Sequence, residues 1–165
     1  MKNRTSWLLA FSLAAVTLPG FAQRPTSDEK NLTLDGARAV LAAAIAVAKN
    51  DEAKTGAIAV VDRSGHLIAL ERLDGTFPAA SQVATGKART AALFQKATRN
   101  FEESINKGRT ALVAVDGMTP LKGGVPILID GKIVGAVGVS GAASQDRDDE
   151  IASAGAAAFA SPQAH

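Results

Sequence analysis

Two hydrophobic periods alternate along this chain of 165 residues, one typical of helices and one typical of strands. Apolar residues recur about every 3.6 positions from Leu34 to Asn50 and again in the segment that begins near Ser144. Each of these segments predicts an amphipathic helix with one buried face. An alanine-rich helix is predicted over residues 79–98, and a short one over 101–107.

Runs of apolar and β-branched residues flank two short turns, which predicts two β-hairpins. The first turn is Arg63-Ser64-Gly65, and the second is Asp130-Gly131, a strong hairpin signal. Turns this short join antiparallel neighbours, because parallel strands need a longer crossover. The predicted strands cover residues 57–62, 66–72, 125–130 and 132–139.

The order helix, hairpin, helix, hairpin, helix predicts an α+β layered domain. Its sheet should be mainly antiparallel, built from the two hairpins and packed by three or four helices. Residues 111–115 form a further apolar run that fits a strand and an irregular segment equally well.

The N-terminus has the pattern of an export signal. Lys2 and Arg4 precede an apolar stretch too short to span a bilayer, and small residues follow at Gly20 and Ala22. Cleavage near Ala22 predicts a periplasmic or secreted protein that starts near Gln23 and has no stable membrane span. The chain then divides into a signal peptide over residues 1–22, a flexible segment over 23–31, one domain over 32–160 and a tail over 161–165.

Charge and composition exclude several classes of function. The formal net charge is +2, and removing Lys2 and Arg4 with the signal leaves a neutral protein. A neutral chain lacks the basic surface of a nucleic-acid-binding protein. The chain has no cysteine, which excludes disulfides, thiolate catalysis and Cys-bound metal.

Three glycines, Gly135, Gly138 and Gly141, have the spacing of a dinucleotide-binding fingerprint. They lie in and just after a predicted strand instead of at a strand-to-helix turn, so that interpretation fails. Glycines in a strand instead permit the close approach of a helix, a ligand or another subunit. The sequence also offers no matched acid and base, so an enzyme is the less favoured hypothesis and no catalytic residue is assigned.

Asp146, Asp149 and Glu150 share one face of the first turn of the last predicted helix. Three carboxylates could hold a hard cation. The simpler interpretation is that acidic residues stabilise a helix N-terminus, by about 0.3 to 1 kcal/mol each.

Other polar side chains could bind a ligand. Lys87 and Thr90 share a helix face that could pair with the carboxylates of a small anion, whereas Arg89 lies on another face. The alternative is a solvated helix surface. His66 could be an axial haem ligand or an exposed histidine beside a turn, and Met118 a thioether ligand or a packing residue.

Four motifs in a fixed order resemble the GlcG/HbpS family and, with it, the C-terminal domain of PduO-type adenosyltransferases. The resemblance extends over nearly all of the predicted mature chain, from about Leu32 to Phe159. The motifs are VVDRSG over residues 60–65, KARTAALF over 87–94, GGVPI over 123–127 and DGKIVGAVGVSG over 130–141.

The resemblance implies a profilin-like domain that forms homo-oligomers and binds haem. Small alanine- and glycine-rich surfaces also favour self-association. If haem binds, the implied axial ligands are His66 and Met118, with Thr119 as another, and Lys87 or Arg89 would face the propionates.

The resemblance also gives a role to Gly123, Gly124, Ser140 and Gly141, as positions where a ligand or a neighbouring subunit approaches the backbone. The alternative function is a non-catalytic accessory module that binds a small organic acid. Lys87, Thr90 and the backbone of Gly123 and Gly124 would then hold the acid.

Overall fold

The computed structural model describes residues 28–50 and 53–159. The predicted signal peptide, most of the segment that follows it and the C-terminal tail lie outside the described residues. No helix of the described residues is long and apolar enough to cross a membrane.

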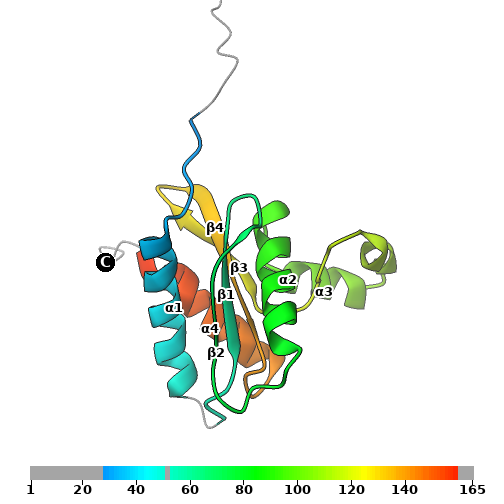
Figure 1. The fold of residues 1–165 in the computed structure, drawn as a ribbon. Helices are drawn as coiled ribbons and strands as arrows, with labels where there is room; N and C mark the ends of the chain where they lie inside the picture. The colour runs from blue at the N-terminus through cyan, green and yellow to red at the C-terminus, as the bar shows by residue number, and fades with distance from the viewer. Residues whose placement is uncertain (1–27, 51–52, 160–165) are drawn as a thin grey trace, which may run out of the picture.

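The centre of the domain is a four-stranded antiparallel sheet with strand order β2-β1-β4-β3 (Figure 1). Each predicted hairpin is present, and β1 pairs with β4 to join the two hairpins into one sheet. The α+β prediction is therefore confirmed. The strands are β1 (Ala57–Asp62), β2 (Leu67–Arg72), β3 (Gly124–Ile129) and β4 (Lys132–Ser140).

The second hairpin turns at Asp130 and Gly131, as the sequence predicts. Both residues have positive φ angles, 52° and 72°, which matches the twist of the adjoining strands. In the first turn, Gly65 takes a φ of 81° and β2 begins at Leu67, one residue later than predicted.

Two helices cover one face of the sheet and one helix covers the other (Figure 1). α1 (Leu34–Lys49) and α4 (Gln145–Ala156) pack with Ile58 and Val60 of β1 in the main core cluster. α2 (Ala80–Leu93) packs its alanines against the opposite face of the sheet. The result is three layers.

Side-chain caps begin the two helices of the first face. Thr33 Oγ1 accepts a hydrogen bond from the Gly36 amide at 3.1 Å, and Ser144 Oγ accepts one from the Arg147 amide at 3.2 Å. Each cap satisfies a backbone donor that the first turn of a helix leaves unpaired. Leu34, predicted to be buried, is 48% exposed because it lies in that first turn at the rim of the core.

The predicted helix over 79–98 is wrong at its C-terminal end, because α2 stops at Leu93. Gln95 adopts a φ of 53°, and the amides of Gln95 and Lys96 donate to the carbonyls of Ala92 and Ala91 at 3.3 and 3.2 Å. These bonds form a Schellman motif, which ends a helix and is usually built on glycine. Glutamine stands there instead, so no glycine marks the end of this helix.

The segment after α2 contains a helix and a turn of 3-10 helix. α3 (Arg99–Asn106) begins two residues before the predicted short helix. The run at 111–115 is not a strand, because residues Thr110–Ala114 form the 3-10 helix η1. This segment packs on α3 and does not pair with either edge strand, β2 or β3, of the described sheet.

Gly138 explains how closely α2 packs on β4. A Cβ atom at this position would lie 2.1 Å from the Ala84 carbonyl oxygen and 2.5 Å from the Ala88 amide nitrogen. Glycine therefore allows helix backbone to lie on strand backbone, which confirms the close-approach interpretation for this residue. The element that approaches is α2 of the same chain.

Candidate functional site

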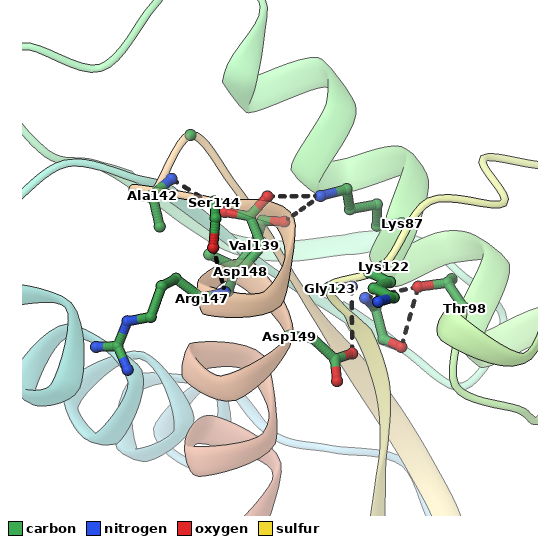
Figure 2. Close-up of polar contacts among 12 residues, drawn as sticks. Lys87, Thr98, Lys122, Gly123, Val139, Ala142, Ser144, Arg147, Asp148 and Asp149 are labelled. Atoms are coloured by element: carbon green, nitrogen blue, oxygen red, sulfur yellow. Dashed lines mark hydrogen bonds and ion pairs between the residues drawn. The ribbon is translucent and has the colours of Figure 1, made fainter. Parts of the chain in front are cut away.

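Lys87 lies inside the protein, and its charge is matched there. Its Nζ donates to the Val139 carbonyl at 2.8 Å and to Asp148 Oδ2 at 2.9 Å (Figure 2). The two charged side chains are only 2% and 6% exposed. The interpretation of Lys87 as part of a solvated helix face is therefore wrong, because the ammonium ties α2 to β4 and α4.

Asp148 is a buried charged residue beside Lys87 that the sequence analysis did not single out. Its second oxygen, Oδ1, accepts the Ala142 amide at 3.0 Å. Burial raises the pKa of Asp148, while the hydrogen bond and charge of Lys87 oppose that rise. The signal was available, because Asp148 precedes Ile151 and Gly155 at helical spacing on the buried face of α4.

The backbone amides of Gly123 and Gly124 form hydrogen bonds to side chains of the same chain. The Gly123 amide donates to Asp149 Oδ1 at 3.3 Å, and the Gly124 amide donates to Thr98 Oγ1 at 2.8 Å (Figure 2). A Cβ at Gly123 would lie 2.7 Å from the Val139 carbonyl oxygen. Both amides are thus already hydrogen-bonded to side chains of this chain.

Thr90 joins the segment after η1 to α2. Its Oγ1 donates to the Gly86 carbonyl at 2.8 Å and accepts the Thr119 amide at 2.8 Å. Met118, the residue before Thr119, is half-buried, and its amide donates to the Val115 carbonyl at 3.2 Å. The Thr90 hydroxyl therefore donates one hydrogen bond and accepts another within the chain, so its proton is not available to a ligand.

A shallow depression of about 330 Å³ lies beside the Lys87 ion pair. Phe77, Val83 and Leu121 give it an apolar wall, and Ser140 and Gly141 also line it. Of the residues predicted to bind a small ligand, Lys87, Ser140 and Gly141 line the depression, whereas Thr90, Gly123 and Gly124 do not. An acid at this site would compete with existing bonds, because the Thr90 hydroxyl and the amides of Gly123 and Gly124 already donate within the chain and two of the three Lys87 N–H groups do so as well.

The three acidic residues considered as a cation site point to three different basic side chains. Asp146 pairs with Lys122 at 2.8 Å, Asp149 with Arg99, and Glu150 with Arg147. The hydrogen bond from Lys122 to Asp146 raises the pKa of that lysine. Among residues 28–50 and 53–159, no three His, Cys, Asp or Glu side chains are grouped to hold a metal ion.

His66 lies at the other end of the sheet from Lys87. Asp62, at the end of β1, pairs with Gly135, whereas Ala57, at the start of β1, pairs with Ser140 beside the depression. The imidazole of His66 is 78% exposed, and its Nδ1 lies 3.4 Å from Asp62 Oδ2. Within the described part of the chain, its Nε2 has no hydrogen-bond partner.

Two side chains of α2 border the turn that carries His66. A Cβ at Gly65 would lie 3.0 Å from Arg89 Cγ and 3.3 Å from Leu93 Cγ. Leu93 is 47% exposed, and Leu67, beside His66 in the chain, is 52% exposed. We call His66, Leu67, Arg89 and Leu93 the His66 surface. Arg89 thus borders the turn that precedes His66, and it lies on the exposed face of α2 whereas Lys87 is buried.

A helix-covered antiparallel sheet of this form defines a class of small α+β domains, and the comparison with known proteins defines the family. Residues 32–157 match the family model described as "Haem degrading protein HbpS-like", so the chain belongs to the HbpS-like family. At the level of that family, the match indicates a haem-related function.

Similar proteins in other bacteria support the same family assignment. Over 104 residues the chain is 48% identical to the protein GlcG of Escherichia coli (strain K12), an alignment that covers 61% of this chain and 78% of GlcG. It is 32% identical over 118 residues to an uncharacterised 15.0 kDa protein from the dhaT-dhaS intergenic region of Citrobacter freundii, covering 65% of this chain and 83% of that protein.

Solved structures share the fold. A double mutant of Streptomyces reticuli HbpS superposes with a TM-score of 0.76 at 31% identity, covering 91% of this chain and 99% of that one. A PduOC:heme complex superposes with a TM-score of 0.68 at 23% identity, covering 79% of this chain and 96% of that one. The second likeness supports the fold alone.

Proposed function

We propose that this protein is an exported haem-binding protein in which His66 is the axial ligand of the iron. The observation that carries the proposal is the family match over residues 32–157.

The contacts of His66 fit the role of a haem ligand. A histidine that binds a metal through one ring nitrogen usually donates the other N–H to a carboxylate, which fixes the ring and raises its basicity. Asp62 is placed for this, since its Oδ2 lies 3.4 Å from Nδ1 and its Oδ1 accepts the His66 amide at 2.9 Å. The exposed Nε2 is then the nitrogen available to iron.

The neighbours of His66 suit the rest of the haem molecule. Leu67 and Leu93 expose apolar side chains that would pack against a porphyrin ring. Arg89 is exposed, and its guanidinium can pair with a propionate. Lys87 does not fit the propionate role, because its ammonium is buried against Asp148. Bound haem would supply an iron centre with an axial position for this imidazole.

Titration of haemin into the purified protein, followed at the Soret band, tests the proposal. The wild type should saturate at a defined stoichiometry, and His66→Ala should bind about tenfold or more weakly with an altered spectrum. His165→Ala is the matched control, because His165 is the other of the two histidines in the chain. It should bind haemin like the wild type.

Two results would contradict this assignment. Binding by His66→Ala that equals the wild type would move the ligand elsewhere, and Met118→Ala and Thr119→Val would then be titrated. Weak binding of haemin by the wild type without saturation would reject haem as the ligand.

Export is the second part of the proposal, supported by the charged and apolar pattern of residues 1–22. We expect the full chain, expressed in a Gram-negative host, to be recovered from the periplasm with Gln23 at its N-terminus. Intact-mass measurement identifies that terminus. Recovery of only the uncleaved chain, from the cytoplasm, would show that residues 1–22 are not a cleaved signal.

A further inference from the structure

Ser140 lines the depression beside the Lys87 ion pair with a hydroxyl group that makes no hydrogen bond to any residue the structure describes. The residue ends β4 and is only 5% exposed. Within the described residues, every fully enclosed side-chain oxygen or nitrogen has a hydrogen-bond partner. The unpartnered Ser140 Oγ is therefore not fully enclosed, and the depression is where a ligand can reach it.

The alternation of side chains along β4 turns Ser140 toward α2. Gly138, two residues earlier on the same face, lies against the Ala84 carbonyl of α2. Lys87, also on α2, donates to the carbonyl of Val139, the residue before Ser140 (Figure 2). The hydroxyl of Ser140 and the ammonium of Lys87 thus reach the depression from neighbouring elements.

The buried polar groups of the depression have hydrogen-bond donors to spare. Lys87 uses two of its three N–H groups within the chain, and the Ser140 hydroxyl uses no proton there. Both carboxylate oxygens of Asp148 already accept bonds, one from Lys87 and one from the Ala142 amide. Spare donors suit a ligand whose oxygen accepts hydrogen bonds, as a carbonyl oxygen does.

The charges around the depression favour an uncharged ligand. Among the described residues that line it, only Lys87 and Asp148 are charged, and they pair at 2.9 Å. The N-terminus of α4 would attract an anion, but its first turn already carries Asp146 and Asp148. An anion would have to compete with Asp148 for Lys87, and a cation would find no unpaired carboxylate, while either would lose its hydration.

Apolar side chains form the other wall of the depression. Phe77 and Leu121 line it and remain 49% and 38% exposed, so a ligand can still cover them. The volume of about 330 Å³ is near the lower end of the range for small-molecule sites. The ligand is therefore small, with an apolar body beside its polar oxygen.

We infer that this depression binds a small, uncharged carbonyl compound. Its oxygen accepts hydrogen bonds from Ser140 and Lys87, and its apolar body packs against Phe77 and Leu121. The ligand differs from an organic acid because it carries no carboxylate. The inference does not depend on haem binding, since His66 lies at the other end of the sheet.

Three compounds that share an aromatic ring and differ in charge test this inference: the ketone acetophenone, the anion benzoate and the cation benzylammonium. Each is titrated into nitrogen-15-labelled protein, and the amide signals are followed by nuclear magnetic resonance. We expect acetophenone to shift the amides of Ser140 and Gly141 to saturation, and the two ions to bind about fivefold or more weakly. Tighter binding of benzoate than of acetophenone, or no saturable shift with acetophenone, would overturn the inference.

Variants locate the binding site. Ser140→Ala should weaken acetophenone binding about threefold or more, because one hydrogen bond is lost. Leu121→Asp should weaken it as well, since it places a charge in the apolar wall. The dispersion of the amide signals shows whether each variant folds.

Ser64→Ala is the matched control, because Ser64 is exposed in the first turn, at the other end of the sheet. Ser64→Ala and His66→Ala should both bind acetophenone like the wild type, and the second separates this site from the proposed haem site. A Ser140→Ala protein that binds acetophenone as tightly as the wild type would overturn the inference.

Discussion

Replacing Lys87 by methionine should lower the free energy of unfolding by about 3–5 kcal/mol at pH 7. The substitution keeps an apolar chain of similar length but leaves the carboxylate of Asp148, which is 6% exposed, without its cation. A buried and unpaired charge is costly, because neither water nor an opposite charge stabilises it. Urea denaturation of the two proteins measures the difference.

The stability lost in Lys87→Met should be larger at neutral pH than at acidic pH. In Lys87→Met, burial still raises the pKa of Asp148, and the opposing lysine is gone, so the folded pKa rises further above the unfolded value of 3.8. A raised folded pKa favours the folded state at low pH, and that contribution is lost as pH rises through the folded pKa. The difference from the wild type should therefore be smaller at pH 4 than at pH 7, and an equal difference at both would contradict the account.

Two further variants distinguish the effect of breaking the buried ion pair from the effect of removing a lysine at the surface. Lys122→Met removes an ammonium that pairs with Asp146 at the surface, so it should change the free energy of unfolding far less than Lys87→Met does. The double variant Lys87→Met/Asp148→Asn carries no buried charge and should be more stable at pH 7 than Lys87→Met alone.

Gly138→Ala should lower the free energy of unfolding by about 3 kcal/mol or more, or prevent folding. The new methyl group would lie 2.1 Å from the Ala84 carbonyl oxygen and 2.5 Å from the Ala88 amide nitrogen. Both atoms belong to the backbone of α2, which cannot yield locally as a side chain can. The helix would have to move away from the sheet and lose close packing along its length.

Gly36→Ala provides the comparison by thermal or urea unfolding. Its added methyl group would meet only side chains, with the flexible end of Leu32 nearest at 2.8 Å. Alanine also favours the helix by about 1 kcal/mol, so the net change should be small. A Gly138→Ala protein within about 1 kcal/mol of the wild type would show that β4 and α2 are less tightly packed than described.

Local signals sufficed for most of the fold. The capping oxygens of Thr33 and Ser144 and the Asp130-Gly131 turn each act within a few residues, so their effects can be seen in the sequence. The end of α2 could not be predicted from the sequence, because Gln95 takes the left-handed conformation that glycine usually adopts. The segment at 111–115 has the composition of a strand, but it folds as a 3-10 helix that packs on α3 and does not join the sheet.

The candidate site was partly predictable. Helical spacing placed Lys87 and Thr90 on one face and Arg89 on another, as observed. The sequence does not reveal the partner of Lys87, because Asp148 is 61 residues away and only the packing of α4 against the sheet brings the two side chains together. Sequence alone also could not show that Arg89 borders the turn of His66, since this contact depends on how α2 lies on the sheet.

Ligation of haem iron by His66 can be tested most directly by pulsed electron paramagnetic resonance of the ferric complex, with every histidine labelled with nitrogen-15. The chain contains only His66 and His165, so a labelled nitrogen coupled to iron has two origins, and single variants distinguish them. We expect the coupling in the wild type and in His165→Ala, and its loss in His66→Ala. A wild-type complex without histidine coupling, or a coupling that survives in His66→Ala, would contradict the assignment of His66.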